Sequence, residues 1–249
     1  MRAMILAAGL GTRLRPLTDD RPKALVQVAG RTLLEIALAR LRRIGINDVI
    51  VNAHHFAHMI VDYLQSNQNF GMNIAVSREY TLLDTGGGLK KAAYFFLENN
   101  SHPADPIVVH NVDVISNIDI KRMLQFHLEH SALATLAVQD RITSRYLLFD
   151  DSGQLRGRQS NDDAQARVGP GPSQMRPLAF CGIHILSPTL LTQMGEEGAF
   201  SIITTYLRLA TVGAQIIGFP ADKYYWRDVG RPDNIAQATR DIEQKLISL

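Results

Sequence analysis

The chain has 249 residues, a formal net charge of +2 and a single cysteine. This charge balance excludes the strongly basic footprint expected of a nucleic-acid surface or of an acidic lipid surface. Because Cys181 has no partner for an internal disulfide and no apolar run is long enough to span a membrane, we expect a soluble cytoplasmic protein without nucleic-acid or membrane partners.

Hydrophobic patterning over residues 1–140 predicts strands that alternate with helices. The expected strands are 3–8, 48–52, 73–77, 106–110 and 133–138, and the expected helices are 32–44, 56–65, 88–97 and 118–129. The first helix opens with a capping box, Thr32-Leu-Leu-Glu35. Such alternation predicts an α/β fold with a mostly parallel sheet and helices on both faces.

The pattern changes after residue 140. A hairpin is expected from 146–149 and 154–157, strands at 178–186 and 215–219, and helices at 200–210 and 232–249. Residues 158–176 are polar and contain Gly169-Pro-Gly-Pro172, which predicts a long mobile loop. We interpret the second half as an elaboration of the first rather than as an independent domain.

A Gly-rich segment follows the first predicted strand. Gly9 and Gly11 allow backbone N–H groups to approach phosphate oxygens, and Arg13 and Arg15 add charge. Leu14 stands where a dinucleotide fingerprint needs its third glycine, and no Gly-Lys-Ser/Thr follows as in a P-loop. An ordinary Gly-rich turn is the alternative interpretation.

Charged and Gly-rich positions recur further along the chain. Lys23 follows Pro22, which fixes its approach, and three glycines at 86–88 precede a predicted helix and leave room for a flat ligand. Asp113 follows the strand 106–110 and suits Mg²⁺, with Asp228 as a second acidic ligand. The alternative interpretations are a solvated lysine for Lys23, a flexible linker for 86–88, a helix cap for Asp113 and a turn aspartate for Asp228.

The positions of these segments in the predicted sheet favour the ligand-binding interpretation. The segments at Gly9, Gly86 and Asp113 each follow the carboxyl end of a predicted parallel strand, so the sheet collects them at one edge. Gly-rich loops, cations and carboxylates at one edge indicate a nucleotide–metal site, and the chemistry they favour is phosphoryl or nucleotidyl transfer. His54, His55, His58 and Asp62 leave zinc as a weaker possibility.

The motifs Leu6-Ala-Ala-Gly-Leu-Gly-Thr-Arg13, Pro22-Lys23 and Asp113 resemble the signature of the sugar-1-phosphate nucleotidyltransferase family. Within that family, Asp84-Thr-Gly-Gly-Gly88, Gly198-Ala-Phe200 and Trp226-Arg-Asp-Val-Gly230 are most similar to the N-acetylmuramate 1-phosphate uridylyltransferases. The resemblance runs over nearly the whole chain. It implies a Rossmann-like core and one nucleotidyltransferase domain over 1–249, with a nucleotide-binding half at 1–140 and a sugar-binding half at 141–249.

The resemblance also implies an activity and a set of site residues. A sugar 1-phosphate would attack the α-phosphate of a nucleoside triphosphate in the presence of Mg²⁺, releasing pyrophosphate. The catalytic residues expected by position are Arg13, Lys23 and Asp113, and the metal ligands are Asp113 and Asp228. Nucleotide contacts are expected at Ala8, Gly9, Gly11, Thr12, Arg13, Gly86 and Gly87, and sugar contacts at Gly88, Asn111, Gly182 and Phe200.

Three departures from the family pattern bear on the acceptor. Val112 replaces a common glycine between Asn111 and Asp113, and the Glu-Lys pair that many relatives use for sugar and phosphate is absent near 175–177. Arg176 or Arg158 is a candidate replacement. The 158–176 loop is longer than in the uridylyltransferases, which leaves the acceptor sugar open, and we predict that the loop is mobile without ligand and closes over the sugar.

The favoured reaction is uridylyl transfer from UTP to an N-acetylated or related hexose 1-phosphate. Two alternatives stay open. The first is a guanylyltransferase acting on mannose 1-phosphate, suggested by Val51-Asn-Ala-His-His55. The second is a catalytically silent sensor of nucleotide sugars. No pattern in the sequence indicates the oligomeric state.

Overall fold

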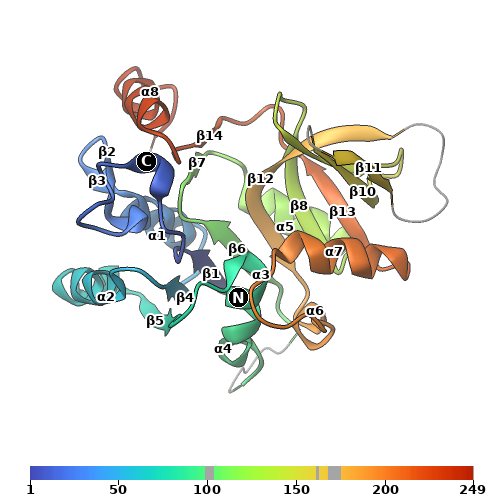
Figure 1. The fold of residues 1–249 in the computed structure, drawn as a ribbon, viewed down its shortest axis with the longest axis horizontal. Coiled ribbons are helices and arrows are strands. Elements are labelled where there is room, and N and C mark those ends of the chain that lie inside the picture. Colours follow the sequence, from blue (N-terminus) through green and yellow to red (C-terminus); the bar gives the residue numbers. More distant parts are fainter. Residues whose placement is uncertain (99–103, 161–162, 168–174, 249) are drawn as a thin grey trace.

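The computed structural model describes residues 1–98, 104–160, 163–167 and 175–248, with backbone alone for 160 and 163–167. A ten-stranded sheet forms its centre (Figure 1). In the first half of the chain β1 (Arg2–Leu6) pairs in parallel with β4 (Asp48–Ala53) and β6 (Ile107–Asn111), and β5 (Asn73–Arg78) extends the sheet beyond β4. These four strands confirm the predicted parallel core.

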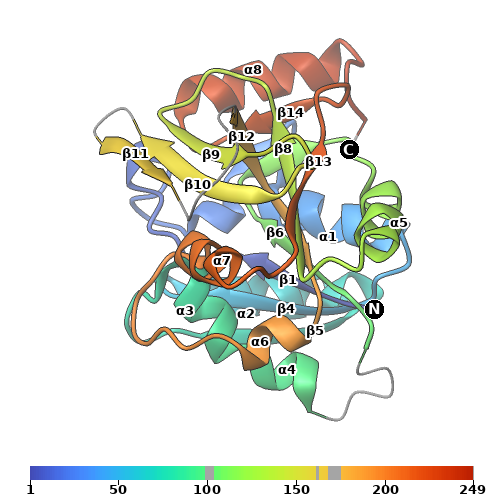
Figure 2. The ribbon, with the colours of Figure 1, turned by 90° about the vertical axis from the view of Figure 1, so that its right-hand side faces the viewer.

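Each face of the parallel strands is buried under helices, which explains their continuous apolar runs. Ala3 and Ile5 face a core covered by α1 (Leu33–Arg43), α2 (Ala57–Ser66), α5 (Ile120–Glu129) and α8 (Pro232–Glu243). Met4 faces the opposite core, covered by α3 (Asp84–Lys91), α4 (Ala93–Leu97), α6 (Thr189–Thr192) and α7 (Ile202–Thr211). Figure 2 shows the two helical layers on either side of the sheet. The predicted α/β class is thereby confirmed.

The long strand β12 (Arg176–Leu186) joins the two halves of the sheet. Its end pairs antiparallel with β6 on one side and with β8 (Ala134–Gln139) on the other, while its start pairs with β9 (Arg145–Phe149). The sheet then continues through β10 (Leu155–Ser160) to β11 (Asp163–Arg167), and β13 (Ile216–Pro220) runs parallel to β8.

Short elements sit around the carboxyl ends of the parallel strands. They include β7 (Val114–Ser116), which pairs with β14 (Trp226–Asp228), and β2 (Gln27–Val28), which pairs with β3 (Arg31–Thr32). Among the described residues, 3₁₀ turns at Thr12–Leu14 and Lys23–Leu25 also lie here, whereas the turn at Gln68–Gly71 precedes β5 at the opposite edge of the sheet. Within the described residues, no helix has the length and apolarity needed to cross a membrane.

Three expectations about element boundaries were wrong. The helix predicted at 88–97 begins at Asp84 and breaks at Ala92, so the glycines at 86–88 lie inside α3 rather than before it. The terminal helix ends at Glu243, not at residue 249. The segment predicted as a loop at 158–176 contains the end of β10 and all of β11, because it pairs with β9 and with itself. Residues 161–162 and 168–174 of that segment lie outside the described residues.

Candidate active site

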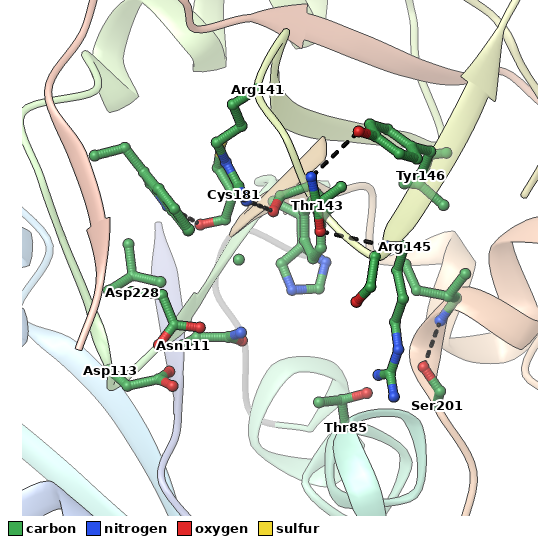
Figure 3. Close-up of a pocket in the computed structure, with 18 of the residues that line it drawn as sticks. Thr85, Asn111, Asp113, Arg141, Thr143, Arg145, Tyr146, Cys181, Ser201 and Asp228 are labelled. Atoms are coloured by element: carbon green, nitrogen blue, oxygen red, sulfur yellow. Dashed lines mark hydrogen bonds between the residues drawn. The ribbon is translucent and has the colours of Figure 1, made fainter. Parts of the chain in front are cut away.

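A cleft of about 1120 Å³ opens at the carboxyl ends of β1 and β6 and extends toward β9, β10 and β12. Leu6 ends β1, and Asn111 ends β6, so the parallel sheet delivers one wall of the cleft. The opposite wall comes from the antiparallel second half and from the start of α7 (Figure 3). Of the predicted site residues, the cleft is lined by Arg13, Asn111, Asp113, Gly182 and Asp228.

Asp113 and Asp228 are brought together by backbone pairing. Asp228 of β14 pairs with Val114 of β7, and the N–H of Val229 donates to the carbonyl of Asp113 over 2.9 Å. The Lys23 ammonium donates to Asp113 Oδ2, and the N–H of Gly230 donates to Asp228 Oδ1 over 2.6 Å. Two carboxylates that are distant in sequence thus face the same end of the cleft (Figure 3).

The donor set at this end fits magnesium. Mg²⁺ usually takes one or two protein carboxylates and completes its octahedron with water and substrate phosphates. Asp113 and Asp228 supply that number, and the described residues contain no group of three or more His, Cys, Asp or Glu side chains that would form a fully protein-ligated site. The zinc alternative at His54, His55 and His58 therefore has no support in the geometry.

The Gly-rich segment after β1 positions the Arg13 side chain. Gly11 has φ of +67°, and its carbonyl accepts from the N–H of Leu14 at 2.8 Å and from Thr18 Oγ1 at 2.9 Å. A Cβ on Gly11 would lie 2.9 Å from Thr18 Cγ2, so the turn requires glycine. A Cβ on Gly230 would lie 2.8 Å from an Arg13 terminal nitrogen and 2.7 Å from Asp228 Oδ1, so this cation and this carboxylate flank Gly230.

The remaining residues predicted after β1 lie outside the lining of the cleft. These are Ala8, Gly9, Gly11 and Thr12, together with Lys23, which reaches the site through its ion pair with Asp113. Ala8 is buried, while a Cβ on Gly9 would meet open space. Contacts of these residues with a nucleotide stay predictions.

The glycines of α3 serve packing within the chain. A Cβ on Gly86 would lie 2.3 Å from the Phe200 ring, and the Gly86 N–H donates to the Phe200 carbonyl over 2.8 Å. A Cβ on Gly87 would lie 2.4 Å from the Gly198 carbonyl oxygen. The chain itself therefore occupies the space that we expected a flat ligand to use, and neither these glycines nor Phe200 line the cleft.

Gly88 packs against a buried polar pair that sequence reasoning missed. Asn52 Oδ1 accepts from the N–H of Ala7 at 2.6 Å, and its Nδ2 donates to Glu79 Oε1 over 2.7 Å. The other oxygen of Glu79 accepts from the N–H of Leu83 at 3.0 Å. A Cβ on Gly88 would lie 2.7 Å from both Asn52 Nδ2 and Glu79 Oε1. The pair joins the ends of β1, β4 and β5 to α3, and a predicted sugar contact at Gly88 has no surface there.

Asn111 and Gly182 meet across the junction of β6 and β12. Gly182 has φ of +70°, and a Cβ there would lie 2.8 Å from Asn111 Nδ2. Trp226 Nε1 donates to the Cys181 carbonyl over 2.7 Å, which fixes β14 against β12. Burial raises the pKa of the Cys181 thiol to about 12, so it stays protonated at neutral pH as an inert core group.

Arg141 locks the same wall and was not anticipated from the sequence. Its guanidinium carbon lies 3.7 Å from the centre of the Trp226 ring, and its Nη2 donates to the Phe180 carbonyl over 2.9 Å. Stacking of this kind contributes about 0.5–1 kcal/mol or more at a partly desolvated site. Only its place at the end of the predicted strand 133–138 could have suggested it.

His184 lies at the floor of the cleft, and its Nδ1 is hydrogen-bonded to the buried Tyr206 hydroxyl. Burial lowers the pKa of His184 to about 3, so the imidazole is neutral. If the Tyr206 hydroxyl donates to Nδ1, the Nε2–H of His184 is the one group of this pair that lacks a partner. If Nδ1–H donated to the Tyr206 oxygen instead, both the Tyr206 O–H and the Nε2 lone pair would lack partners. Because a buried unpaired group is costly, we infer the Nε2–H tautomer.

Comparison with known proteins identifies a family and similar sequences. Residues 2–158 match the family model described as nucleotidyl transferase. The chain is 39% identical over 246 residues to an N-acetylmuramate alpha-1-phosphate uridylyltransferase from Neisseria meningitidis serogroup B, covering 96% of each protein. It is 34% identical over 243 residues to mannose-1-phosphate guanyltransferase 2 from Candida glabrata, covering 96% of this chain and 64% of that protein.

A solved structure shares the fold over the whole length. A Bacillus anthracis protein described as a glucose-1-phosphate thymidylyltransferase superimposes with a TM-score of 0.80, at 17% identity, covering 100% of this chain and 97% of that one. At this identity the similarity is evidence for the fold alone.

Proposed function

This chain belongs to the nucleotidyl transferase family of sugar-1-phosphate nucleotidyltransferases, and from that premise we propose that it joins UTP to an N-acetylated or related hexose 1-phosphate. The products are a UDP-sugar and pyrophosphate. The observation that carries the proposal is the convergence of Arg13, Lys23, Asp113 and Asp228 at the end of one cleft, where the parallel strands terminate.

In the proposed reaction an oxygen of the sugar phosphate forms a bond to the α-phosphorus of UTP, while the bond from that phosphorus to the bridging oxygen of pyrophosphate breaks. Arg13 and Lys23 offset the negative charge that the phosphates bring together, and no proton transfer from the chain is required. The 3₁₀ turns at Thr12–Leu14 and Lys23–Leu25 order the backbone that carries the two cations, and the Lys23 side chain is also held by its ion pair with Asp113.

Magnesium is the proposed cofactor, with Asp113 and Asp228 as its protein ligands. When bound, it would neutralise phosphate charge and polarise the phosphorus under attack. The ion pair between Lys23 and Asp113 balances the charge of that carboxylate at this end of the cleft. The same lysine therefore lies where both the metal ligands and the reacting phosphates are expected.

The first test is pyrophosphate release from the full-length protein with Mg²⁺, using panels of nucleoside triphosphates and sugar 1-phosphates. We expect release that depends on both substrates, with UTP preferred. A flat response across all combinations would contradict the proposal and would favour a silent nucleotide-sugar sensor.

Guanylyl transfer is the second candidate, because the Candida glabrata relative carries that activity in its name. Thermal unfolding with UTP or GTP separates the two, since a ligand that binds only the folded state raises its stability. We expect a larger rise in Tm with UTP. A larger rise with GTP would replace the uridylyl proposal with the guanylyl one.

A further inference from the structure

The strand that carries Asp228 needs support from outside its own sheet. Strand β14 is three residues long and pairs, within the described residues, with β7 alone. Because a two-stranded ribbon is at best marginally stable by itself, the position of Asp228 depends on what anchors β14 from its two faces. Side chains alternate along an extended strand, so Trp226 shares a face with Asp228, and Tyr225 shares the other face with Arg227. Trp226 is tied to β12 through the Cys181 carbonyl.

The face of Tyr225 and Arg227 is anchored to helix α8 through one buried carboxylate. Asp241 is 3% exposed, and its Oδ2 accepts from the Tyr225 hydroxyl at 2.6 Å and from Arg227 Nε at 3.0 Å. The Nη2 of Arg227 lies 2.9 Å from the same oxygen, and Asp241 Oδ1 accepts from Gln237 Nε2 at 2.8 Å. Charge-assisted hydrogen bonds of this kind are the stronger ones in proteins, so Asp241 and Arg227 fix each other's position.

Helix α8 also holds the backbone of Asp228. Asn234, in the first turn of the helix, donates from Nδ2 to the Asp228 carbonyl over 2.8 Å. Asn234, Gln237 and Asp241 are spaced three and four residues apart, so they form one polar stripe along α8. Figures 1 and 2 both show α8 beside β14. The helix therefore holds β14 at two consecutive residues, by the side chain of Arg227 and by the backbone of Asp228.

The relative position of the two proposed metal ligands depends on where β14 lies. Asp228 pairs with Val114 of β7, and the N–H of Val229 donates to the Asp113 carbonyl over 2.9 Å. Asp113 belongs to the turn after β6, so a shift of β14 would move the Asp228 carboxylate relative to it. Mg²⁺ requires near-ideal octahedral geometry, with ligand distances of about 2.0–2.1 Å, and tolerates such a shift poorly.

We propose that Asp241 is a positioning residue for the metal. Through Arg227 and Tyr225 it fixes β14 so that Asp228 and Asp113 bind the same ion. The inference rests on the proposed function, because it assigns the support of the proposed Mg²⁺ ligands. Asp241 does not line the cleft, so it acts on the metal only through β14. Groups that orient metal ligands from outside the coordination sphere typically contribute about 10- to 100-fold in metal affinity.

Mn²⁺ is the probe, because it shares the preference of Mg²⁺ for octahedral oxygen ligands. The full-length protein is titrated without nucleotide, and the electron paramagnetic resonance signal of free Mn²⁺ gives the Kd. We expect Asp241→Asn to weaken Mn²⁺ binding about 10-fold. Tyr225→Phe removes one contact of Asp241 without removing a charge, and we expect it to weaken binding less.

Arg227→Gln separates positioning from a simple effect of charge. Asp241→Asn removes a negative charge and Arg227→Gln removes a positive one, so a Coulombic effect alone would weaken Mn²⁺ binding in the first variant and strengthen it in the second. Positioning predicts weaker binding in both. The double variant is expected to bind Mn²⁺ no more weakly than the weaker single variant, because both substitutions break the same contact.

Two matched controls remove the same charges elsewhere. Asp150, 6% exposed, pairs with Arg156 at 2.7 Å in the β9–β10 hairpin, and Asp150→Asn breaks a buried ion pair that does not touch β14. Arg122 pairs with Glu129 on the exposed face of α5, and Arg122→Gln removes a positive charge there. We expect an unchanged Kd for Mn²⁺ in both controls, even where Tm falls.

An unchanged Kd in a folded Asp241→Asn variant would overturn the inference, and so would tighter or unchanged binding in Arg227→Gln. Equal weakening in Asp150→Asn would also overturn it, because the effect would then follow from lost stability. If Asp241→Asn does not fold, Tyr225→Phe and Arg227→Gln carry the test. Failure of the proposed function is a different result, in which no pair of substrates releases pyrophosphate, whereas the Kd for Mn²⁺ needs no turnover.

Discussion

Two regions of the cleft differ in how their charged side chains are held: the carboxylates Asp113 and Asp228 accept hydrogen bonds within the chain, whereas Arg145 and Arg158, on the β9–β10 hairpin, have no ion pair among the described residues. Lys23 pairs with Asp113, and Asp228 accepts from the backbone. The two carboxylates are therefore positioned by contacts within the chain, which the described residues do not provide for the two arginines.

The largest effect is expected from Asp113→Asn. The substitution removes a proposed metal ligand and leaves Lys23 without its carboxylate, so we expect kcat/KM to fall about 10²- to 10³-fold, as when one stabilising group is lost from a preorganised site. Steady-state pyrophosphate release measures this. An unchanged far-UV circular dichroism spectrum shows that the variant is folded. Near-normal activity in that folded variant would contradict the proposed role of Asp113.

The contact that joins the two halves is tested by Gly86→Ala. Alanine is favoured over glycine by about 1 kcal/mol in a helix, but its Cβ would lie 2.3 Å from the Phe200 ring and 2.9 Å from its carbonyl oxygen. Overpacking costs about 1–3 kcal/mol, so we expect a net loss of stability in chemical denaturation. Gly195→Ala, where a Cβ meets nothing within 4 Å, is the matched control. A Gly86→Ala variant more stable than the unmodified protein would show that the space between Gly86 and Phe200 can accept a methyl group.

Acid sensitivity of the fold is expected to arise from three buried histidines rather than from the charged side chains of the cleft. Burial lowers the pKa of His127 to about 4, and those of His110 and His184 to about 3. Because the unfolded chain binds protons at these sites below pH 6.5 and the folded chain does not, the free energy of unfolding decreases as pH falls from about 6.5 toward 4.

The variant His127→Asn sharpens this point, since His127 lies on α5 and does not line the cleft. One buried histidine contributes a slope of up to about 1.4 kcal/mol per pH unit in this range. We expect the pH dependence of the unfolding free energy, measured by urea titration between pH 4.5 and 6.5, to become shallower by about that amount. An unaltered slope would mean that His127 is protonated in the folded state.

The smallest effect is expected from Arg122→Gln. The Arg122–Glu129 pair spans 3.5 Å on the exposed face of α5, and such pairs contribute about 0–1 kcal/mol. We therefore expect unchanged kinetics and a change in stability below about 1 kcal/mol by denaturant titration. A larger loss would make this variant unsuitable as a control.

Periodicity and strand-end position were sufficient to predict the parallel core and the wall of the cleft that carries Asp113. Asp113 and Arg13 follow strands whose apolar runs are unambiguous, and the rule that parallel strands end at one edge places them together. The glycines at 86–88 mark the limit of such patterns, because glycine-rich sequence indicates close approach but not whether a ligand or the chain itself approaches. Here Phe200 and Gly198 do so.

The antiparallel wall of the cleft was less predictable, for a physical reason. Pairs such as Arg145 with Ser160 depend on register that local patterning does not encode. Polar residues at 158–160 were interpreted as a loop, although β10 includes them. The Asn52–Glu79 pair was missed because its members lie 27 residues apart and are joined only by the packing of β4 against β5.

One binding comparison tests the difference between the two regions most directly. The Kd of Mn²⁺ is measured by electron paramagnetic resonance in the unmodified protein, in Asp228→Asn and in Arg145→Gln. The account predicts that Asp228→Asn, which removes a proposed ligand, weakens binding by at least about 10-fold. It predicts an unchanged Kd in Arg145→Gln, because that guanidinium is directed toward Thr85 and Ser201, away from both aspartates (Figure 3). An unchanged Kd in Asp228→Asn, or an equal weakening in Arg145→Gln, would contradict it.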